Sequence, residues 1–199
     1  MFQNFILLYY IMSKQAKAKM IAYYENELKK MLSDSDFKRY FGEGKVIKYS
    51  ELDNYSTIND LLPNDKDFRI ILIESQYNQG HWCAILKYGD IIEYFNSYGT
   101  RPEHDFKFIP TFTKHLLGQG GNLLTKLLKT KTKGQKVYYN KKKLQEINDG
   151  VNTCGRHVVA RILGMLTGYE LDDYINKVED KVEETGKPPD ILVIDWIKN

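Results

Sequence analysis

Residues 68–74 are the segment that most constrains the fold of this chain. Apolar side chains occupy the four consecutive positions 70–73, and three of these residues are isoleucine. A strand that is apolar at consecutive positions, rather than at every second position, is typical of a strand buried on both faces. The sequence therefore predicts a core strand here, in a sheet that is covered on both sides.

Two further segments predict a β-hairpin after a polar turn at residues 75–80. Residues 81–88 and 91–96 both have the composition of strands, and Gly89-Asp90 joins them. His81 then lies near the start of the first strand and Asn96 near the end of the second. We therefore expect these two side chains to lie side by side across the strand pair.

A helix is expected to begin at Cys154, because apolar residues recur at helical spacing at positions 158, 159, 162, 163 and 166. Unpaired N–H groups and the positive end of the helix dipole favour the thiolate form of a cysteine at this place. Asn152 or Thr153 is expected to cap the helix, and Gly155 to leave room for a substrate. A lone cysteine before a helix is also compatible with a packed core thiol.

The remaining segments predict short helices and strands around this centre. Apolar spacing and breaking residues indicate helices at 13–32, 37–41, 116–117, 123–128 and 171–178, a helical turn at 57–62, strands at 46–49 and 136–140, an extended piece at 106–110, and a polar loop at 141–153. A last helix is expected from Asp190, as its cap, to Trp196, and a strand is the alternative for this β-branched run.

The composition indicates one domain over residues 1–199, because 199 residues with 42% hydrophobic content can bury one core. Residues 1–12 are expected to be a loosely ordered extension, since their apolar run is too short to span a bilayer. Two cysteines, Cys83 and Cys154, cannot form a disulfide scaffold and indicate thiols in a reducing compartment. The sequence contains no recognisable metal-ligand set, and no cofactor is expected.

One set of residues could perform nucleophilic chemistry. A nucleophilic thiol needs a base within hydrogen-bond reach, and the base needs a partner that fixes its tautomer. Cys154, His81 and Asn96 could supply these three parts if the helix packs on the hairpin. The other histidines are weaker candidates for the base, because they are expected in a turn (His104), in a short helix (His115) and within the cysteine's own helix (His157).

Four segments together resemble the signature blocks of the adenain and ubiquitin-like (SUMO) protease clan of cysteine proteases. They are His81-Trp82, residues 95–99, Leu144-Gln145 and residues 152–156. The resemblance is closest to the capsid-maturation proteases of virophages and related large DNA viruses, and it covers residues 46–166. It implies an α+β fold of the adenain/ubiquitin-like-protease type, with a central mixed β-sheet flanked by helices.

The resemblance also implies roles for the site residues: His81 as general base, Asn96 as its orienting partner, Cys154 as nucleophile and Gln145 as oxyanion donor. Gln145 lies further upstream of the cysteine than is usual in the clan, so the loop 146–151 would have to bulge, and Asn148 is the fallback donor. Many members have Asp or Glu where Asn96 stands, so the polarising charge is missing. An aspartate there is expected to keep or improve activity.

Substrate choice is a further implication of the resemblance. In the clan, the tryptophan after the catalytic histidine helps to roof a narrow channel that only glycine fits. Trp82 and Gly155 are therefore expected to contact the substrate, with cleavage after a glycine.

The activity implied is that of a viral cysteine endopeptidase that cleaves capsid or core precursor proteins during virion maturation. It would act in the virion and in the host cytoplasm, at the viral factory, without a membrane partner. The alternatives are a deconjugating isopeptidase for a ubiquitin-like modifier, an acyltransferase, and a catalytically inactive virion or nucleic-acid-binding protein.

Lysines crowd between positions 126 and 143, although the net charge of the chain is only +3. They could form a basic surface that holds the protein on packaged DNA, or a solvated lysine face without a partner. The candidates are Lys126, Lys129, Lys131, Lys133, Lys136, Lys141, Lys142 and Lys143.

Overall fold

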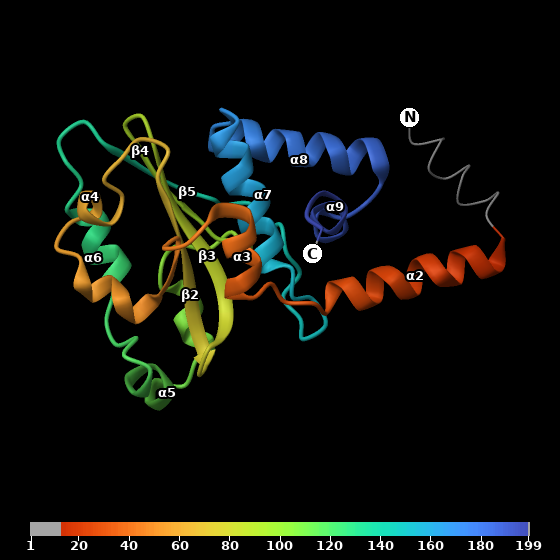
Figure 1. Cartoon of the computed structure of the whole chain (residues 1–199), viewed down its shortest axis with the longest axis horizontal. Helices are drawn as coiled ribbons and strands as arrows, with labels where there is room; N and C mark the ends of the chain where they lie inside the picture. The colour runs from red at the N-terminus through yellow and green to blue at the C-terminus, as the bar shows by residue number, and fades with distance from the viewer. Residues whose placement is uncertain (1–12, 199) are drawn as a thin grey trace.

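A five-stranded mixed sheet is the centre of the computed structural model, which describes residues 13–198 (Figure 1). The strands follow one another across the sheet in chain order. They are β1 (Val46–Lys48), β2 (Phe68–Gln76), β3 (Gln79–Tyr88), β4 (Ile91–Phe95) and β5 (Lys136–Tyr139). The inner strands β2, β3 and β4 are antiparallel, and β1 and β5 join the two edges in parallel. The predicted α+β class with a mixed sheet is confirmed.

Strand β2 is buried on both faces, as its sequence predicts. Ile70 and Leu72 belong to the apolar core on one side of the sheet, and Ile71 and Ile73 to the core on the other side. None of the four is more than 6% exposed. The run of consecutive apolar residues therefore serves two cores at once.

Helices cover both faces of the sheet. One core is closed by α3 (Asp34–Phe41), α7 (Cys154–Leu166), α8 (Leu171–Thr185) and α9 (Pro189–Trp196). The other is closed by η1 (Tyr49–Asn54), α4 (Ile58–Leu61), η2 (His104–Phe108) and α6 (Leu123–Lys129). Helix α5 (Thr111–Leu116) lies at the end of the β2–β3 hairpin, and α2 (Lys14–Leu28) projects from the body beside α9 (Figure 1).

Two ion pairs fix the helix that carries Cys154. Arg161 and Glu93 form a fully buried pair of 2.6 Å that joins α7 to β4. Arg156 donates to the carboxylate of Glu27 over 2.7 Å and to the carbonyl of the same residue over 3.0 Å. A further bond of 3.4 Å reaches the carbonyl of Ile197, so this guanidinium holds the end of α2 and the end of α9 against α7.

Several predicted elements differ from the structure. The extended piece at 106–110 is wrong, because this segment is largely the 3₁₀-helix η2, and the first helix ends at Leu28 rather than near residue 32. The last segment is a helix and not a strand, but Pro188 rather than Asp190 is its N-cap. The turn between β2 and β3 is also shorter than the expected residues 75–80, since β2 ends at Gln76 and β3 begins at Gln79. The expectation for residues 1–12 lies outside the described residues.

Candidate active site

Cys154 is the first residue of α7 and is buried, with 6% of its surface exposed. Neither predicted side chain caps this helix. Thr153 occupies the N-cap position, but its hydroxyl donates to the carboxylate of Asp190, and the amide of Asn152 donates to the carbonyl of Lys29 over 3.0 Å. The N–H groups at the helix start therefore have no side-chain cap, and the one of Gly155 helps to stabilise the Cys154 thiolate.

His81 and Cys154 line the same cleft, and each shifts the pKa of the other. Burial alone would raise the pKa of Cys154, but the hydrogen bond to His81, the charge of that imidazole and the N–H groups of Trp82 and Gly155 outweigh burial and lower it. Burial lowers the pKa of His81, whereas its contacts with Cys83 and Cys154 raise it well above the ordinary value. Both shifts favour a thiolate–imidazolium pair.

Asn96 orients the imidazole. Nε2 of His81 lies 2.8 Å from Oδ1 of Asn96, and the N–H of Tyr98 donates to the same oxygen over 3.0 Å. The expected contact of His81 with Asn96 is therefore confirmed, although it is diagonal. Ala84 pairs with Phe95, so Asn96 continues the strand opposite Cys83 rather than opposite His81. The ring of Tyr98 also stacks on the imidazole, with 4.1 Å between the ring centres.

The tautomer of His81 follows from these contacts. Because a carbonyl oxygen only accepts, Nε2 must carry the proton. Nδ1 is then the ring nitrogen that can accept a thiol proton, as a general base must.

Gln145 lies in the same cleft as Cys154 and His81. Its side-chain oxygen accepts from the hydroxyl of Ser97 over 2.7 Å, and its amide nitrogen donates to the carbonyl of Val151 over 3.0 Å. One of the two amide hydrogens thus holds the loop, and the role of Gln145 as oxyanion donor stays a prediction. The loop 146–151 does turn back on itself, since the N–H of Val151 donates to the carbonyl of Asn148 over 3.2 Å.

The fallback donor Asn148 also lines the cleft. It is exposed, and its side-chain oxygen accepts from the N–H of Gly150 over 2.8 Å. The buried Gln145, held at both ends of its amide, is the better ordered of the two candidates.

The cleft has a volume of about 390 Å³ and an apolar rim. Met31, Phe108 and Ile147 line it and are 45%, 62% and 52% exposed. A second cavity of about 620 Å³ adjoins it, because Met31, Gln79 and Gly80 line both. The two hollows therefore lie side by side, and Cys154 lines the smaller one.

Trp82 lines the second cavity rather than the cleft of Cys154. Its indole N–H donates to the carbonyl of Leu32 over 3.0 Å, and its ring meets the ring of Phe37 edge to face at 4.8 Å. The selection of glycine by Trp82 stays a prediction.

Gly155 packs against other residues and does not provide open space. A Cβ atom there would lie 2.8 Å from Cβ of Leu32 and 3.2 Å from Cζ of Phe37. The expectation that Gly155 leaves room for a substrate is therefore wrong, because the side chains of Leu32 and Phe37 occupy that room.

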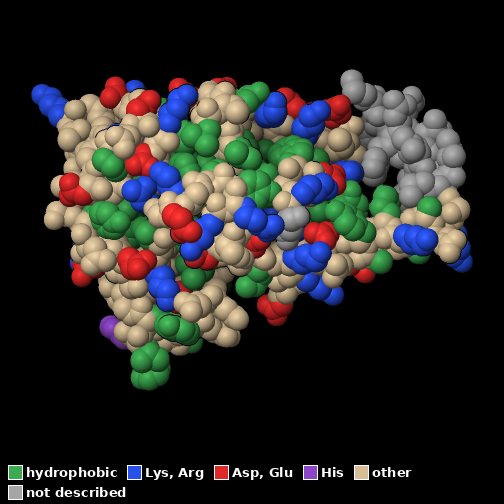
Figure 2. Space-filling view, in the orientation of Figure 1, with side chains coloured by type: hydrophobic (Ala, Val, Ile, Leu, Met, Phe, Trp, Pro, Cys, Tyr) green, Lys and Arg blue, Asp and Glu red, His purple; other side chains and the backbone are tan. Residues whose placement is uncertain are grey.

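The structure divides the predicted lysine surface into two groups. Lys129, Lys131 and Lys133 lie before β5, whereas Lys141, Lys142 and Lys143 follow it. Two members of the second group are in ion pairs, Lys142 with Glu179 and Lys143 with Glu146. Figure 2 shows blue and red side chains interspersed on one face of the molecule rather than a patch of one sign.

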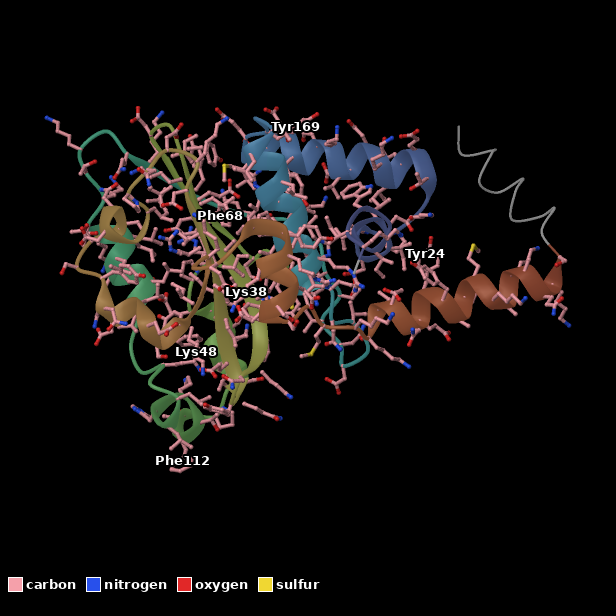
Figure 3. All side chains as sticks on the ribbon, viewed as in Figure 1. Tyr24, Lys38, Lys48, Phe68, Phe112 and Tyr169 are labelled. Atoms are coloured by element: carbon pink, nitrogen blue, oxygen red, sulfur yellow. The ribbon has the colours of Figure 1, made fainter. Side chains whose placement is uncertain are left out.

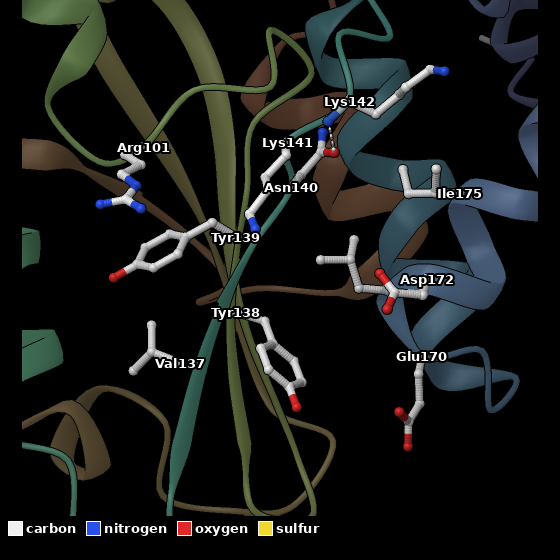
Figure 4. A pocket seen from close by; sticks show the side chains of 11 residues that line it. Arg101, Val137, Tyr138, Tyr139, Asn140, Lys141, Lys142, Glu170, Asp172 and Ile175 are labelled. Atoms are coloured by element: carbon white, nitrogen blue, oxygen red, sulfur yellow. Dashed lines mark hydrogen bonds between the residues drawn. The ribbon is translucent and has the colours of Figure 1, made fainter.

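A larger cavity, of about 720 Å³, lies away from the candidate site. Figure 4 shows it between β5 and the start of α8, with Tyr138 and Lys142 on one side and Glu170 and Asp172 on the other. None of the residues assigned a catalytic role lines it.

Within residues 13–198, no group of three or more His, Cys, Asp or Glu side chains is placed to hold a metal ion. Among the same residues, no helix has both the length and the apolar character needed to cross a membrane.

Comparison with known proteins identifies one relative. No protein family model matches the sequence. The chain is 33% identical over 177 residues to the "Uncharacterized protein V9" of Sputnik virophage, a match that covers 88% of this chain and 97% of V9. The chain belongs to the V9 family. Since V9 is encoded by a virophage, this membership supports a viral protein. The resemblance to the adenain clan stays a prediction.

Sequence reasoning missed an acidic residue of the V9-family site. Asp105 lines the cleft, and its carboxylate accepts a hydrogen bond of 2.6 Å from the amide nitrogen of Asn96. The only signal in the sequence is an acidic residue shortly after the turn that follows Asn96. That signal is hidden because the sequence predicts an extended piece at residues 106–110.

Proposed function

We propose that this V9-family protein is a viral cysteine endopeptidase. The observation that carries the proposal is that Cys154, His81 and Gln145 line one cleft, where His81 is hydrogen-bonded to Asn96 and Cys154 and His81 shift each other's pKa. A lowered Cys154 pKa and a raised His81 pKa are what an activated thiol requires.

In the proposed reaction, the thiolate of Cys154 attacks the carbonyl carbon of the scissile peptide bond. The resulting oxyanion accepts hydrogen bonds from the free amide hydrogen of Gln145 and from the N–H at the start of α7. His81 Nδ1 then protonates the leaving amine, which departs and leaves a thioester on Cys154. A water molecule gives a proton to His81 and attacks the thioester, and the collapse of this second intermediate releases the acid and restores the thiolate.

The cleft supports a polypeptide as the substrate. The cleft of Cys154 adjoins a second cavity, and its rim carries the exposed side chains of Met31, Phe108 and Ile147. We infer that apolar substrate residues beside the scissile bond contact this rim. Capsid or core precursor proteins are the proposed substrates, in the virion and in the cytoplasm of the host at the viral factory.

Incubation with the capsid proteins encoded in the same genome tests the proposal. We expect cleavage by the wild type that iodoacetamide abolishes, and none by Cys154→Ala. Mass spectrometry of the new termini would also report whether the cut follows a glycine.

The alternatives give other results in the same assay. Release of a ubiquitin-like modifier from a conjugate, with intact capsid proteins, would favour an isopeptidase. Transfer of an acyl group to a protein would favour an acyltransferase. Absence of any thiol-dependent turnover would favour an inactive virion protein and contradict the proposal.

Association with packaged DNA is a separate proposal, and it depends on the lysines around β5. Binding to duplex DNA across a salt series should show a log K that falls with log salt. Exchange of Lys129, Lys131 and Lys133 for glutamine should reduce the slope by about 0.9 for each phosphate that is no longer neutralised. A variant with Lys38→Gln, on helix α3 (Figure 3), is the control for loss of a lysine outside this group. An affinity independent of salt would exclude DNA binding.

A further inference from the structure

Asp105 is a buried carboxylate directly behind Asn96, with 6% of its surface exposed. Its Oδ2 accepts a hydrogen bond of 2.6 Å from Nδ2 of Asn96, and its Oδ1 accepts one of 2.9 Å from the hydroxyl of Thr100. The oxygen of Thr100 in turn accepts a hydrogen bond of 2.7 Å from Nδ2 of Asn96. The three side chains therefore form a closed ring on the nitrogen side of the amide.

These contacts allow the Asn96 amide only one of its two orientations. At one end, the N–H of Tyr98 can only donate, and it lies 3.0 Å from Oδ1. At the other end, an ionised Asp105 can only accept, and it lies 2.6 Å from Nδ2. A flipped amide would set donor against donor at Tyr98 and oxygen against oxygen at Asp105.

The orientation of the amide decides the state of the base. With Oδ1 toward His81, Nε2 donates and Nδ1 is free to accept the proton of Cys154. With the amide flipped, Nε2 would have to accept, the proton would move to Nδ1, and the neutral imidazole could no longer act as a base toward the thiol.

We propose that Asp105 is a positioning residue of the site. It holds the Asn96 amide in the orientation that directs Oδ1 toward His81. Its carboxylate also supplies, through Asn96, the negative charge that the neutral Asn96 lacks. As part of a reaction, this role rests on the proposed protease function. The amide transmits the charge because a hydrogen bond to a carboxylate polarises the C=O group that faces His81.

The charged and titratable groups around His81 and Asn96 come from four elements. They are Cys83 on β3, Tyr94 on β4, Cys154 on α7 and Asp105 on η2, together with Tyr98 in the turn after β4. The charge of Asp105 reaches this cluster. Burial raises the pKa of Tyr98, His81 opposes this shift, and Cys154 and Asp105 add to it.

Alkylation of Cys154 by iodoacetamide, followed by mass spectrometry across a pH series, tests the role without any substrate. Asp105→Asn keeps the shape of the side chain and removes its charge. Loss of that charge should lower the pKa of His81, destabilise the ion pair and raise the apparent pKa of Cys154. A rise of about one unit in the apparent pKa of Cys154 reduces the alkylation rate roughly tenfold at pH values below the midpoint of the profile.

Two matched sets of variants separate positioning from folding. Asp53→Asn removes the charge of an exposed aspartate on η1 and should leave the alkylation profile unchanged. Thr100→Val removes the hydroxyl that bridges Asn96 and Asp105, so it should move the midpoint of the alkylation profile in the same direction as Asp105→Asn. Thr100→Ser keeps the hydroxyl and should have the wild-type midpoint. Thermal melts of each variant report the folded fraction.

If the folded Asp105→Asn variant has the same midpoint in its alkylation profile as the wild type, the inference is overturned. A lower melting temperature with an unmoved midpoint would also overturn it, because it would assign Asp105 a purely structural role. Failure of the proposed function is a different result, namely a wild-type protein that alkylates with the expected profile but cleaves no precursor.

Discussion

Replacing Gly155 by alanine tests what the residue beside the nucleophile does. If the glycine is there for packing, Gly155→Ala should destabilise the fold. If it is there to admit a substrate, the same change should leave stability unaltered and impair only binding. The structure supports packing, since the added Cβ would lie 2.8 Å from Cβ and 3.2 Å from Cγ of Leu32, and 3.2 Å from Cζ of Phe37.

The expected size of the effect follows from these distances. Leu32 is 2% exposed and Phe37 fully buried, so neither side chain can turn into solvent. Overpacking of a dense core by one methyl group costs about 1–3 kcal/mol. Alanine recovers up to about 1 kcal/mol of helix propensity over glycine. Subtracting this gain leaves a net loss of about 0–2 kcal/mol, which lowers the melting temperature of a domain of this size by up to roughly 8 °C.

A double-mutant cycle with Leu32→Ala, read by thermal and urea unfolding, makes the test specific. Leu32→Ala alone should cost about 2–5 kcal/mol. Its cost should be at least about 1 kcal/mol smaller in the Gly155→Ala background, because the new methyl group fills part of the cavity. Unchanged stability of Gly155→Ala, with an additive cycle, would refute the packing role.

Three further predictions concern the site and its support. Thiol-dependent activity should appear as the pH rises through the lowered pKa of Cys154 and disappear as the pH passes the raised pKa of His81. A rate that only increases up to about pH 10 would contradict the thiolate–imidazolium pair. Asn96→Asp should lower activity at neutral pH, because the new carboxylate would lie about as close to the Asp105 carboxylate as Nδ2 of Asn96 does now, at 2.6 Å. The double variant Asn96→Asp with Asp105→Asn should recover most of the activity. Arg161→Met should cost about 3–5 kcal/mol in urea unfolding, because Glu93 is left buried without its partner, and a cost below about 1 kcal/mol would show that the pair is dispensable.

The prediction for Asn96→Asp changes sign between sequence and structure. From the sequence, an aspartate should keep or improve activity, since it would restore a charge beside His81. In the structure, Nδ2 of Asn96 donates to both Thr100 and Asp105, and a carboxylate has no hydrogen to donate. The carboxylate of Asp105 already lies directly behind Asn96, so a carboxylate at position 96 would face a second carboxylate.

The parts of the fold that local pattern determines were predictable. Consecutive apolar residues at 70–73 identify a strand with two buried faces, and alternation places Trp82 and Cys83 in the two different cores. The spacing of apolar residues after Cys154 also identifies the start of α7. In each of these cases the signal is contained within a short stretch of sequence.

The parts that depend on distant partners were not predictable. Thr153 does not cap α7 because Asp190, 37 residues later, takes its hydroxyl. Gly155 is needed because Leu32 and Phe37, far away in the sequence, pack against its Cα. The place of Asp105 behind Asn96 depends on the 3₁₀-helix η2, where the sequence predicts an extended piece.

The lengths of the strands have a consequence for aggregation. The two longest strands, of nine and ten residues, lie inside the sheet, and the edge strands β1 and β5 have only three and four residues. Unpaired strand edges are the templates on which other chains add, and short edges offer few free N–H and C=O groups. Lys136, at the start of β5, adds a charge that an incoming strand would have to bury. The folded protein is thereby protected from edge-to-edge polymerisation at high concentration.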